Sequence, residues 1–284
     1  MKILITGAGG FLGRRAAAYF RALGWQVIAP ARTELDITDA AEVRRRMLQY
    51  KPQAVLHCAA VSDTGACRSD PQGTALINVQ GAENVAFACR MLGIKAVLCS
   101  SDQVYAGSIL PAPHREDELL MPSHAYAQQK LQAERLWLGH CPDGVCLRLS
   151  WMYDAVPQPA EHGSFMTMLL AALRDESLPL CLPVHDRRGI TDVNAVINAL
   201  PKALALEGGV YNFGAPGGED TFHTLQKVFG ALGLADALAR LRPDEQAFAA
   251  APRDIRMDCT RAAAAGIVFE DTQQGLCRVL RAVL

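Results

Sequence analysis

The stretch MKILITGAGGFLG, residues 1–13, predicts how the fold begins. Residues 2–6 are typical of a short buried strand, and three glycines follow at Gly7, Gly10 and Gly13 before a helical pattern starts. Glycine is needed where such a turn is tight, where backbone approaches a pyrophosphate and where a helix packs closely on a strand. The first N–H groups of the helix are unpaired and attract negative charge. The stretch therefore predicts a nucleotide-phosphate site, although similar turns also occur for purely structural reasons.

Composition narrows the class of protein. The chain has 284 residues, a net charge of -1 and nine scattered cysteines without a CxxC pair. These features favour a cytoplasmic protein with reduced thiols, and they give no support to nucleic acid as a partner. No apolar run is long enough to span a membrane, and no signal peptide is expected. The histidines lack partners at metal-ligand spacing, so no metal is expected.

Strand and helix patterns alternate through the first half of the chain. After residues 2–6, buried strands are expected at 26–29, 54–57, 96–99 and 144–148. This alternation predicts an α/β fold, a Rossmann-type doubly wound parallel sheet with helices on both faces. We assign residues 1–148 to the dinucleotide-binding domain.

Beyond the fifth strand the regular alternation of strand and helix patterns ends. Residues 149–284 are expected to form mainly a smaller C-terminal substrate-binding region, with a segment near 192–215 returning to the sheet. Few periodic apolar residues occur in 149–164 or in 182–194, so both are interpreted as loops. A helix is expected at 165–174, between them.

Two further features concern a dinucleotide. The second strand runs into Arg32 without an acidic residue before Glu34, which favours NADP over NAD, because arginine accepts a 2′-phosphate. A solvated surface arginine is the alternative interpretation of Arg32. After the third strand, the small residues Cys58, Ala59 and Ala60 stand where the chain must pass under a bound ligand.

The candidate catalytic residues are Ser101, Tyr126 and Lys130. Tyr126 and Lys130 are four residues apart, which places them on one face of a helix, and Ser101 follows the fourth strand. A lysine ammonium and an oxidised nicotinamide are expected to lower the pKa of the tyrosine, which then serves as acid and base, while Ser101 hydrogen-bonds the carbonyl oxygen. The alternative is a surface lysine beside a half-buried tyrosine. The order of glycine turn, serine and Tyr-Lys pair favours catalysis.

These motifs resemble the extended short-chain dehydrogenase/reductases. GAGGFLG has their GxxGxxG spacing, NVQGAENV (78–85) resembles NVxGTxNV, and YAQQK (126–130) resembles YxxxK. Within that family the chain is most similar to the dTDP-4-dehydrorhamnose reductase branch, through LDITD, SSDQVYAG, LRLSWMYD and GSFMTMLLAAL. The likeness covers most of residues 1–200.

The resemblance implies NAD(P)H-dependent reduction of a 4-keto group on a deoxysugar nucleotide, with Ser101, Tyr126 and Lys130 as the catalytic residues. It adds Phe11, Leu12, Asp36, Ile37 and Asn78 to the cofactor site, which also includes Tyr126 and Lys130. Its substrate contacts would be Gln103, Val104, Trp151 and Arg187. The expected partner is a small-molecule substrate of the sugar-nucleotide class, with neither nucleic acid nor membrane expected, and a homodimer is left open.

Two segments depart from the branch. Gln103 and Ala106 replace its tyrosine and aspartate, and VHDRRGIT lacks the glutamine and proline of its DQxGxPT, leaving Arg187 and Arg188 there. Two alternatives therefore stay open. One is a non-catalytic NADP-binding partner protein of the same fold, similar to the regulatory subunit of methionine adenosyltransferase. The other is a sugar-nucleotide epimerase.

Overall fold

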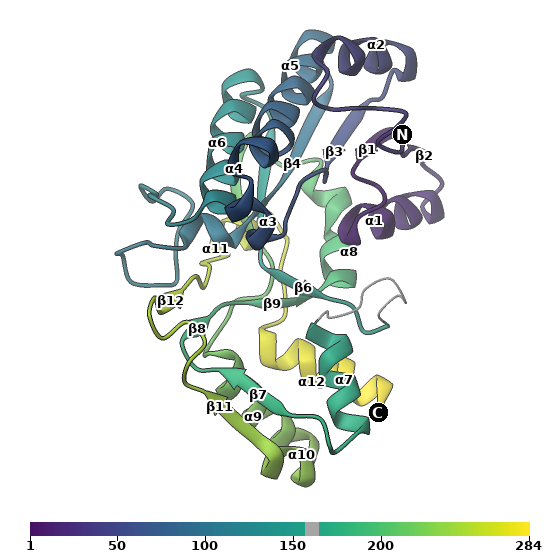
Figure 1. Ribbon diagram of the computed structural model, residues 1–284. Helices are drawn as coiled ribbons and strands as arrows, with labels where there is room; N and C mark the ends of the chain where they lie inside the picture. Colours follow the sequence, from purple (N-terminus) through teal and green to yellow (C-terminus); the bar gives the residue numbers. More distant parts are fainter. Residues whose placement is uncertain (157–164) are drawn as a thin grey trace.

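The computed structural model describes residues 1–156 and 165–284. A large part built on one sheet contains the N-terminus, and a smaller part of helices and short strands contains the C-terminus (Figure 1). Within the two described ranges, no helix has the length and apolar character that crossing a membrane requires.

Six parallel strands form the main sheet in the order β10-β5-β4-β3-β1-β2. Chain reversal about β1 places β2 on one side and β3 on the other, and Ile3 pairs with Val27 and Ala54 across these two edges. Such a switch point opens a crevice at the carboxyl ends of the strands, where ligands bind. The strands are β1 (Lys2–Thr6), β2 (Gln26–Ile28), β3 (Ala54–His57), β4 (Lys95–Ser101), β5 (Val145–Leu149) and β10 (Gly209–Phe213).

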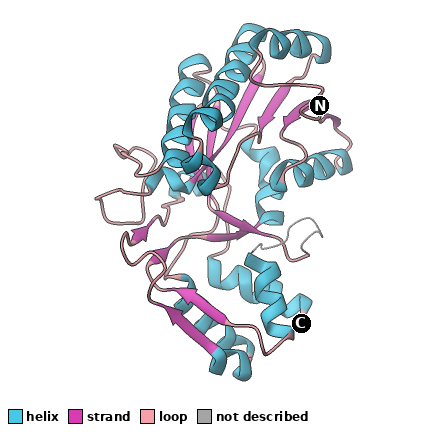
Figure 2. Cartoon of the chain, in the orientation of Figure 1, coloured by secondary structure: helices cyan, strands magenta, loops and turns pink. Residues whose placement is uncertain are grey.

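Helices cover both faces of the sheet, because successive side chains of a strand point to opposite faces. Ile3 and Ile5 belong to one hydrophobic cluster and Leu4 to another. The first cluster includes residues of α1 (Phe11–Ala22) and α8 (Val193–Ala203), and the second includes residues of α2 (Ala40–Tyr50), α5 (Ala82–Leu92) and α6 (Ala125–His140). Figure 2 shows helices on both sides of the sheet. The predicted Rossmann-type α/β class is confirmed.

Residues 71–92 form one helical segment that is not regular. It consists of α4 (Pro71–Ala75), a π-helical turn η1 (Leu76–Gly81) and α5. The short helix α3 (Thr64–Ser69) precedes it. A π turn inserts an extra residue into the helix and changes which side chains share a face, and such turns are frequent at functional sites.

The smaller part packs around its own hydrophobic cluster, which includes Phe165, Leu225 and Leu276. Three parallel two-stranded pairs run through it, β6 with β9, β7 with β11 and β8 with β12. Its strands are β6 (Trp151–Tyr153), β7 (Leu180–Pro183), β8 (Asp186–Arg187), β9 (Ile190–Asp192), β11 (Leu241–Asp244) and β12 (Arg253–Asp254). Its helices are α7 (Phe165–Arg174), α9 (Thr221–Leu232), α10 (Ala235–Arg240) and α12 (Thr272–Val283), while α11 (Thr260–Ala264) packs on β10.

The two predicted loops are partly wrong. Residues 149–164 contain the strand β6, and residues 182–194 contain β8, β9 and the end of β7. These strands have two to four residues, too few to show a period of two in the sequence, and each pairs with a segment far along the chain. Part of the first predicted loop, residues 157–164, lies outside the described residues. The predicted helix at 165–174 is confirmed.

Candidate active site

The glycine turn joins β1 to α1 with the close contacts that the sequence predicts. Gly7 has a φ of +66°, and a Cβ added there would lie 2.6 Å from the backbone nitrogen and Cα of Ala59. A Cβ added at Gly13 would collide with the carbonyl oxygen of Gly7. A side chain at either position would therefore force backbone apart, which explains glycine at both.

A cavity of about 420 Å³ opens at this turn. Eight residues predicted to bind the cofactor line it: Gly7, Gly10, Arg32, Asp36, Ile37, Cys58, Ala59 and Ala60. The structure places Phe11, Leu12 and Gly13 in the first residues of α1, next to the turn. The cavity therefore extends from the helix N-terminus to the loop after β2, across the switch point of the sheet.

Arg32 and Asp36 lie at the far end of this cavity, beyond β2. The Asp36 carboxylate accepts hydrogen bonds from the backbone nitrogen and the hydroxyl of Thr38, at 2.9 and 2.8 Å. These two bonds lower the pKa of Asp36, and the nearby Arg32 guanidinium lowers it further. The exposed Arg32 side chain thus borders a cavity that also contains a carboxylate.

Asn78 supports the cavity wall from behind. It is buried in the π turn, where its side-chain oxygen accepts from the Val61 nitrogen at 2.7 Å and its amide donates to the Val61 carbonyl at 3.0 Å. The same amide donates to Gln129 on α6 at 2.7 Å. Val61 lines the cavity, so Asn78 connects the loop after β3 to the helix that carries Tyr126.

Ser101, Tyr126 and Lys130 come together at the carboxyl end of β4. Ser101 is the last residue of that strand, and the other two occupy one face of α6. All three are at least nine-tenths buried, and the Ser101 side chain is close enough to Tyr126 to affect its pKa. The Lys130 ammonium donates to the Cys99 carbonyl at 2.6 Å. The predicted residues are thus neighbours in space.

Ser101, Tyr126 and Lys130 do not line the cavity, but a pair of cysteines connects them to its wall. The thiol of Cys99 lies 3.6 Å from the thiol of Cys58, which lines the cavity wall. Lys130 therefore contacts the strand residue that lies directly against that wall.

Burial controls the protonation of these groups. It raises the pKa of Tyr126 to about 12, and the nearby Ser101 side chain lowers it by a smaller amount. The Asp102 carboxylate raises this pKa and the Arg188 guanidinium lowers it. Burial also lowers the pKa of the Lys130 ammonium, against the opposite effects of Cys99 and Glu134. The expected lowering of the tyrosine pKa by an oxidised nicotinamide stays a prediction; in the chain alone, removal from water outweighs the effect of the nearby Arg188 guanidinium.

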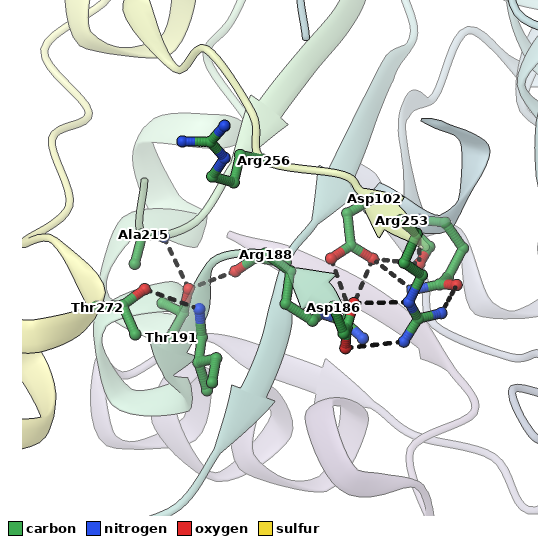
Figure 3. Close-up of polar contacts among 12 residues, drawn as sticks. Asp102, Asp186, Arg188, Thr191, Ala215, Arg253, Arg256 and Thr272 are labelled. Atoms are coloured by element: carbon green, nitrogen blue, oxygen red, sulfur yellow. Dashed lines mark hydrogen bonds and ion pairs between the residues drawn. The ribbon is translucent and has the colours of Figure 1, made fainter. Parts of the chain in front are cut away.

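An ion pair that was not predicted from the sequence lies beside Ser101. Asp102, next to Ser101, is 1% exposed and its carboxylate binds Arg188 through contacts of 2.7 and 3.0 Å (Figure 3). The Arg188 guanidinium also lies over the Trp151 ring, 5.2 Å from its centre. No sequence pattern links Asp102 to Arg188, because 86 residues separate them.

Gln103 takes part in a second cluster. Its side-chain oxygen accepts from Arg253 at 3.1 Å and contacts the His124 ring at 3.3 Å. Arg253 is in turn paired with Asp186 on β8, at 2.6 Å (Figure 3). The segment that departs from the dTDP-4-dehydrorhamnose reductase branch thus packs directly on the residues after Ser101.

The other predicted substrate contacts differ in exposure. Val104 is 1% exposed and packs in a hydrophobic cluster with Tyr105 and Leu120, so its side chain belongs to the core. Arg187 is exposed on β8, whereas the adjacent Asp186 is buried. Alternation along the strand explains this, because neighbouring side chains point to opposite sides. Trp151, by contrast, is partly exposed beside Arg188.

The switch-point cavity and the buried Ser-Tyr-Lys set define a dinucleotide-binding protein of the short-chain dehydrogenase/reductase class. The chain belongs to the family described as the RmlD substrate binding domain, whose model matches residues 1–284.

Relatives and solved structures agree with this assignment. The chain is 32% identical to a dTDP-4-dehydrorhamnose reductase of Streptomyces griseus, over 93% of this chain and 88% of the relative. It is 30% identical to methionine adenosyltransferase 2 subunit beta of Xenopus laevis, over 94% of this chain and 83% of the relative. A crystal structure of dTDP-4-dehydrorhamnose reductase from Bacillus anthracis, in complex with NADP, has the same fold, with a TM-score of 0.84 at 23% identity over 99% of each chain.

Proposed function

We propose that this chain is an NADPH-dependent reductase that acts on the keto group of a sugar nucleotide. The observation that carries the proposal is the buried Ser101, Tyr126 and Lys130 set, which adjoins the glycine-lined cavity through Cys99. The relatives named dTDP-4-dehydrorhamnose reductase support the choice of substrate class.

The residues around the cavity fit a dinucleotide. The backbone of the glycine turn leaves room for phosphate oxygens beside the start of α1, where N–H groups are unpaired. Asp36 is suited to ribose hydroxyls, and Arg32 to a 2′-phosphate. We assign the predicted cofactor set to this role, with Phe11, Leu12 and Gly13 forming the helix start and Asn78 holding the wall.

In the proposed reaction, NADPH supplies a hydride to the carbonyl carbon of the sugar. Tyr126 donates its proton to the carbonyl oxygen, and its raised pKa keeps that proton in place at neutral pH. The Ser101 hydroxyl donates a hydrogen bond to the same oxygen as negative charge develops there. Lys130, fixed on the Cys99 carbonyl, supplies a positive charge one helical turn after the tyrosine. The product is the corresponding alcohol.

The proposal divides the chain at residue 148. Residues 1–148 would bind the dinucleotide, and residues 149–284 would mainly contact the sugar nucleotide, with Trp151 and Gln103 at the boundary. The smaller part has a hydrophobic cluster of its own, which supports this division. The strand β10 joins the main sheet as its edge strand, which supports the expected return of a segment near 192–215 to the sheet.

The direct test is oxidation of NADPH with dTDP-4-dehydrorhamnose as substrate. We expect turnover by the wild type and a loss of about a hundredfold or more in Tyr126→Phe, because general acid catalysis contributes roughly that factor. Tyr19→Phe, on α1 and away from this edge, is the matched control and should keep full activity.

Tight NADPH binding without reduction of any 4-keto sugar nucleotide would contradict the proposed reductase activity. That result would favour a partner protein, the role that the name of the Xenopus laevis relative indicates for that protein.

A cytoplasmic location and a homodimer belong to the same proposal. The nine cysteines are all free thiols, as a reducing compartment requires. Phe87 and Met91, one turn apart on α5, are about half exposed and would suit a helix-to-helix contact between two chains. Cell fractionation and sedimentation analysis test the two statements separately.

A further inference from the structure

The Asp102 carboxylate receives more donors than one oxygen binds well. Its Oδ1 atom accepts from Arg188 at 3.0 Å, from the Ser101 hydroxyl at 3.2 Å and from the Gln103 amide at 3.3 Å. The other oxygen accepts from Arg188 at 2.7 Å. An O–H···O bond is usually about 2.7–2.8 Å long, so the bond from Ser101 is a weak one. Arg188 therefore makes the shorter hydrogen bonds to this carboxylate, and Ser101 and Gln103 make the longer ones.

The competition matters because a serine has a single hydroxyl proton. In the proposed reaction that proton must turn toward the substrate carbonyl, and a strong acceptor next to Ser101 would retain it. Asp102 is buried, so without its arginine the carboxylate would take its hydrogen bonds from whatever donors remain. The remaining donors are Ser101 and Gln103.

Arg188 is itself held in place. Its side chain is 10% exposed, it donates through one terminal nitrogen to both Asp102 oxygens, and it lies over the Trp151 ring. Trp151 belongs to β6, and Arg188 lies between β8 and β9. A guanidinium suits this position because it is always charged and stacks on an aromatic ring while it binds a carboxylate.

We propose that Arg188 is a positioning residue for Ser101: by occupying the Asp102 carboxylate, it leaves the serine hydroxyl free for the substrate carbonyl. The role rests on the proposed function and deepens it, because it connects the region assigned to the substrate with the catalytic edge. Arg188 acts through Asp102 and does not itself meet the reacting atoms.

The test compares three variants of the full chain, with dTDP-4-dehydrorhamnose and NADPH as probes. Arg188→Gln should lower kcat by about tenfold or more, up to the loss of about a hundredfold known for one missing oxyanion donor, with little change in the Kd of NADPH. Arg188→Gln combined with Asp102→Asn should recover much of that kcat, because an amide oxygen holds the serine proton less strongly than an unpaired carboxylate. Arg45→Gln, which removes an exposed arginine–carboxylate pair with Glu42 on α2, is the matched control and should leave kcat unchanged.

The outcomes separate the two proposals. A wild type that reduces the substrate while Arg188→Gln keeps its kcat would overturn the role of Arg188 alone. A double variant no more active than Arg188→Gln would overturn it as well, because the role requires that removal of the acceptor frees the serine hydroxyl. Removing the second charge can also restore stability, so urea unfolding of each variant shows whether kcat recovers beyond the recovery of folded protein. If Arg188→Gln does not fold, Arg188→Lys takes its place because it keeps the positive charge. A kcat of Arg188→Lys within twofold of the wild-type value would support the role, on condition that the double variant is also active. No turnover by the wild type would remove the proposed function and this role with it.

Discussion

Replacing Gly7 by alanine tests the close approach of backbone on which the cavity depends. Gly7 has a φ of +66°, a left-handed conformation that costs an L-residue about 1–2 kcal/mol. In addition, the new Cβ would lie 2.6 Å from two backbone atoms of Ala59. Backbone cannot turn away as a side chain can, and overpacking of this kind typically costs about 1–3 kcal/mol. We therefore expect Gly7→Ala to lower the free energy of unfolding by about 2–5 kcal/mol.

Gly24→Ala provides the matched control. Gly24 has a φ of +77°, similar to that of Gly7, but a Cβ added there would meet nothing within 4 Å. This variant should therefore lose only the conformational part, about 1–2 kcal/mol. The reduced freedom of the unfolded chain is the same for both substitutions and cancels in the comparison.

Urea unfolding of the two variants measures the difference, since the midpoint shifts while the slope stays constant if only stability changes. Gly7→Ala should also bind NADPH more weakly, whereas Gly24→Ala should bind it as the wild type does, because only Gly7 lines the cavity among these two. Equal losses of stability in both variants would refute the argument, because they would show that the contact with Ala59 carries no cost.

Three further predictions concern charge. Arg148 and Glu134 form a buried pair at 2.8 Å, so Arg148→Met should cost about 3–5 kcal/mol in urea unfolding, and adding Glu134→Gln should return part of that loss. Burial lowers the pKa of His57 to about 3, below its ordinary value of 6.5, so stability is present above pH 6.5 and declines as the pH falls. The free energy of unfolding of His57→Asn should therefore fall by about 2 kcal/mol less than that of the wild type between about pH 7 and pH 5. Parallel curves of unfolding free energy against pH would contradict this. Arg32→Ala should raise the Kd of NADPH and leave that of NADH alone, whereas equal effects on both would remove Arg32 from the phosphate site.

Local patterns explain why the cofactor half was predictable. Gly7 and Gly13 act within one turn of chain, and Tyr126 and Lys130 share a helix face because they are four residues apart. Ser101 is the last residue of β4, and the ends of parallel strands lie together at the carboxyl edge of the sheet, so Ser101 had to reach that edge. None of these placements depends on how distant segments pack.

The substrate side depends on such packing. Arg187 and Arg188 are equivalent in the sequence, and only the pairing of β8 with β12 determines that the first is exposed while the second reaches Asp102. Val104 follows the catalytic strand closely but turns into the core within the 3-10 helix η2 (Asp102–Tyr105). Spacing in the sequence does not reveal either outcome.

The Arg188–Asp102 pair also constrains how this protein can change its substrate. Asp102 is bonded to Ser101 through the chain and through a hydrogen bond, and Arg188 contacts Trp151. A substitution at Arg188 that alters recognition of the sugar therefore also alters the acceptor beside the catalytic hydroxyl. A substitution at the exposed Arg187 carries no such consequence. Under the proposed role of Arg188, recognition and catalysis are thus coupled at one of two adjacent arginines, because Arg188 contacts both Asp102 and Trp151.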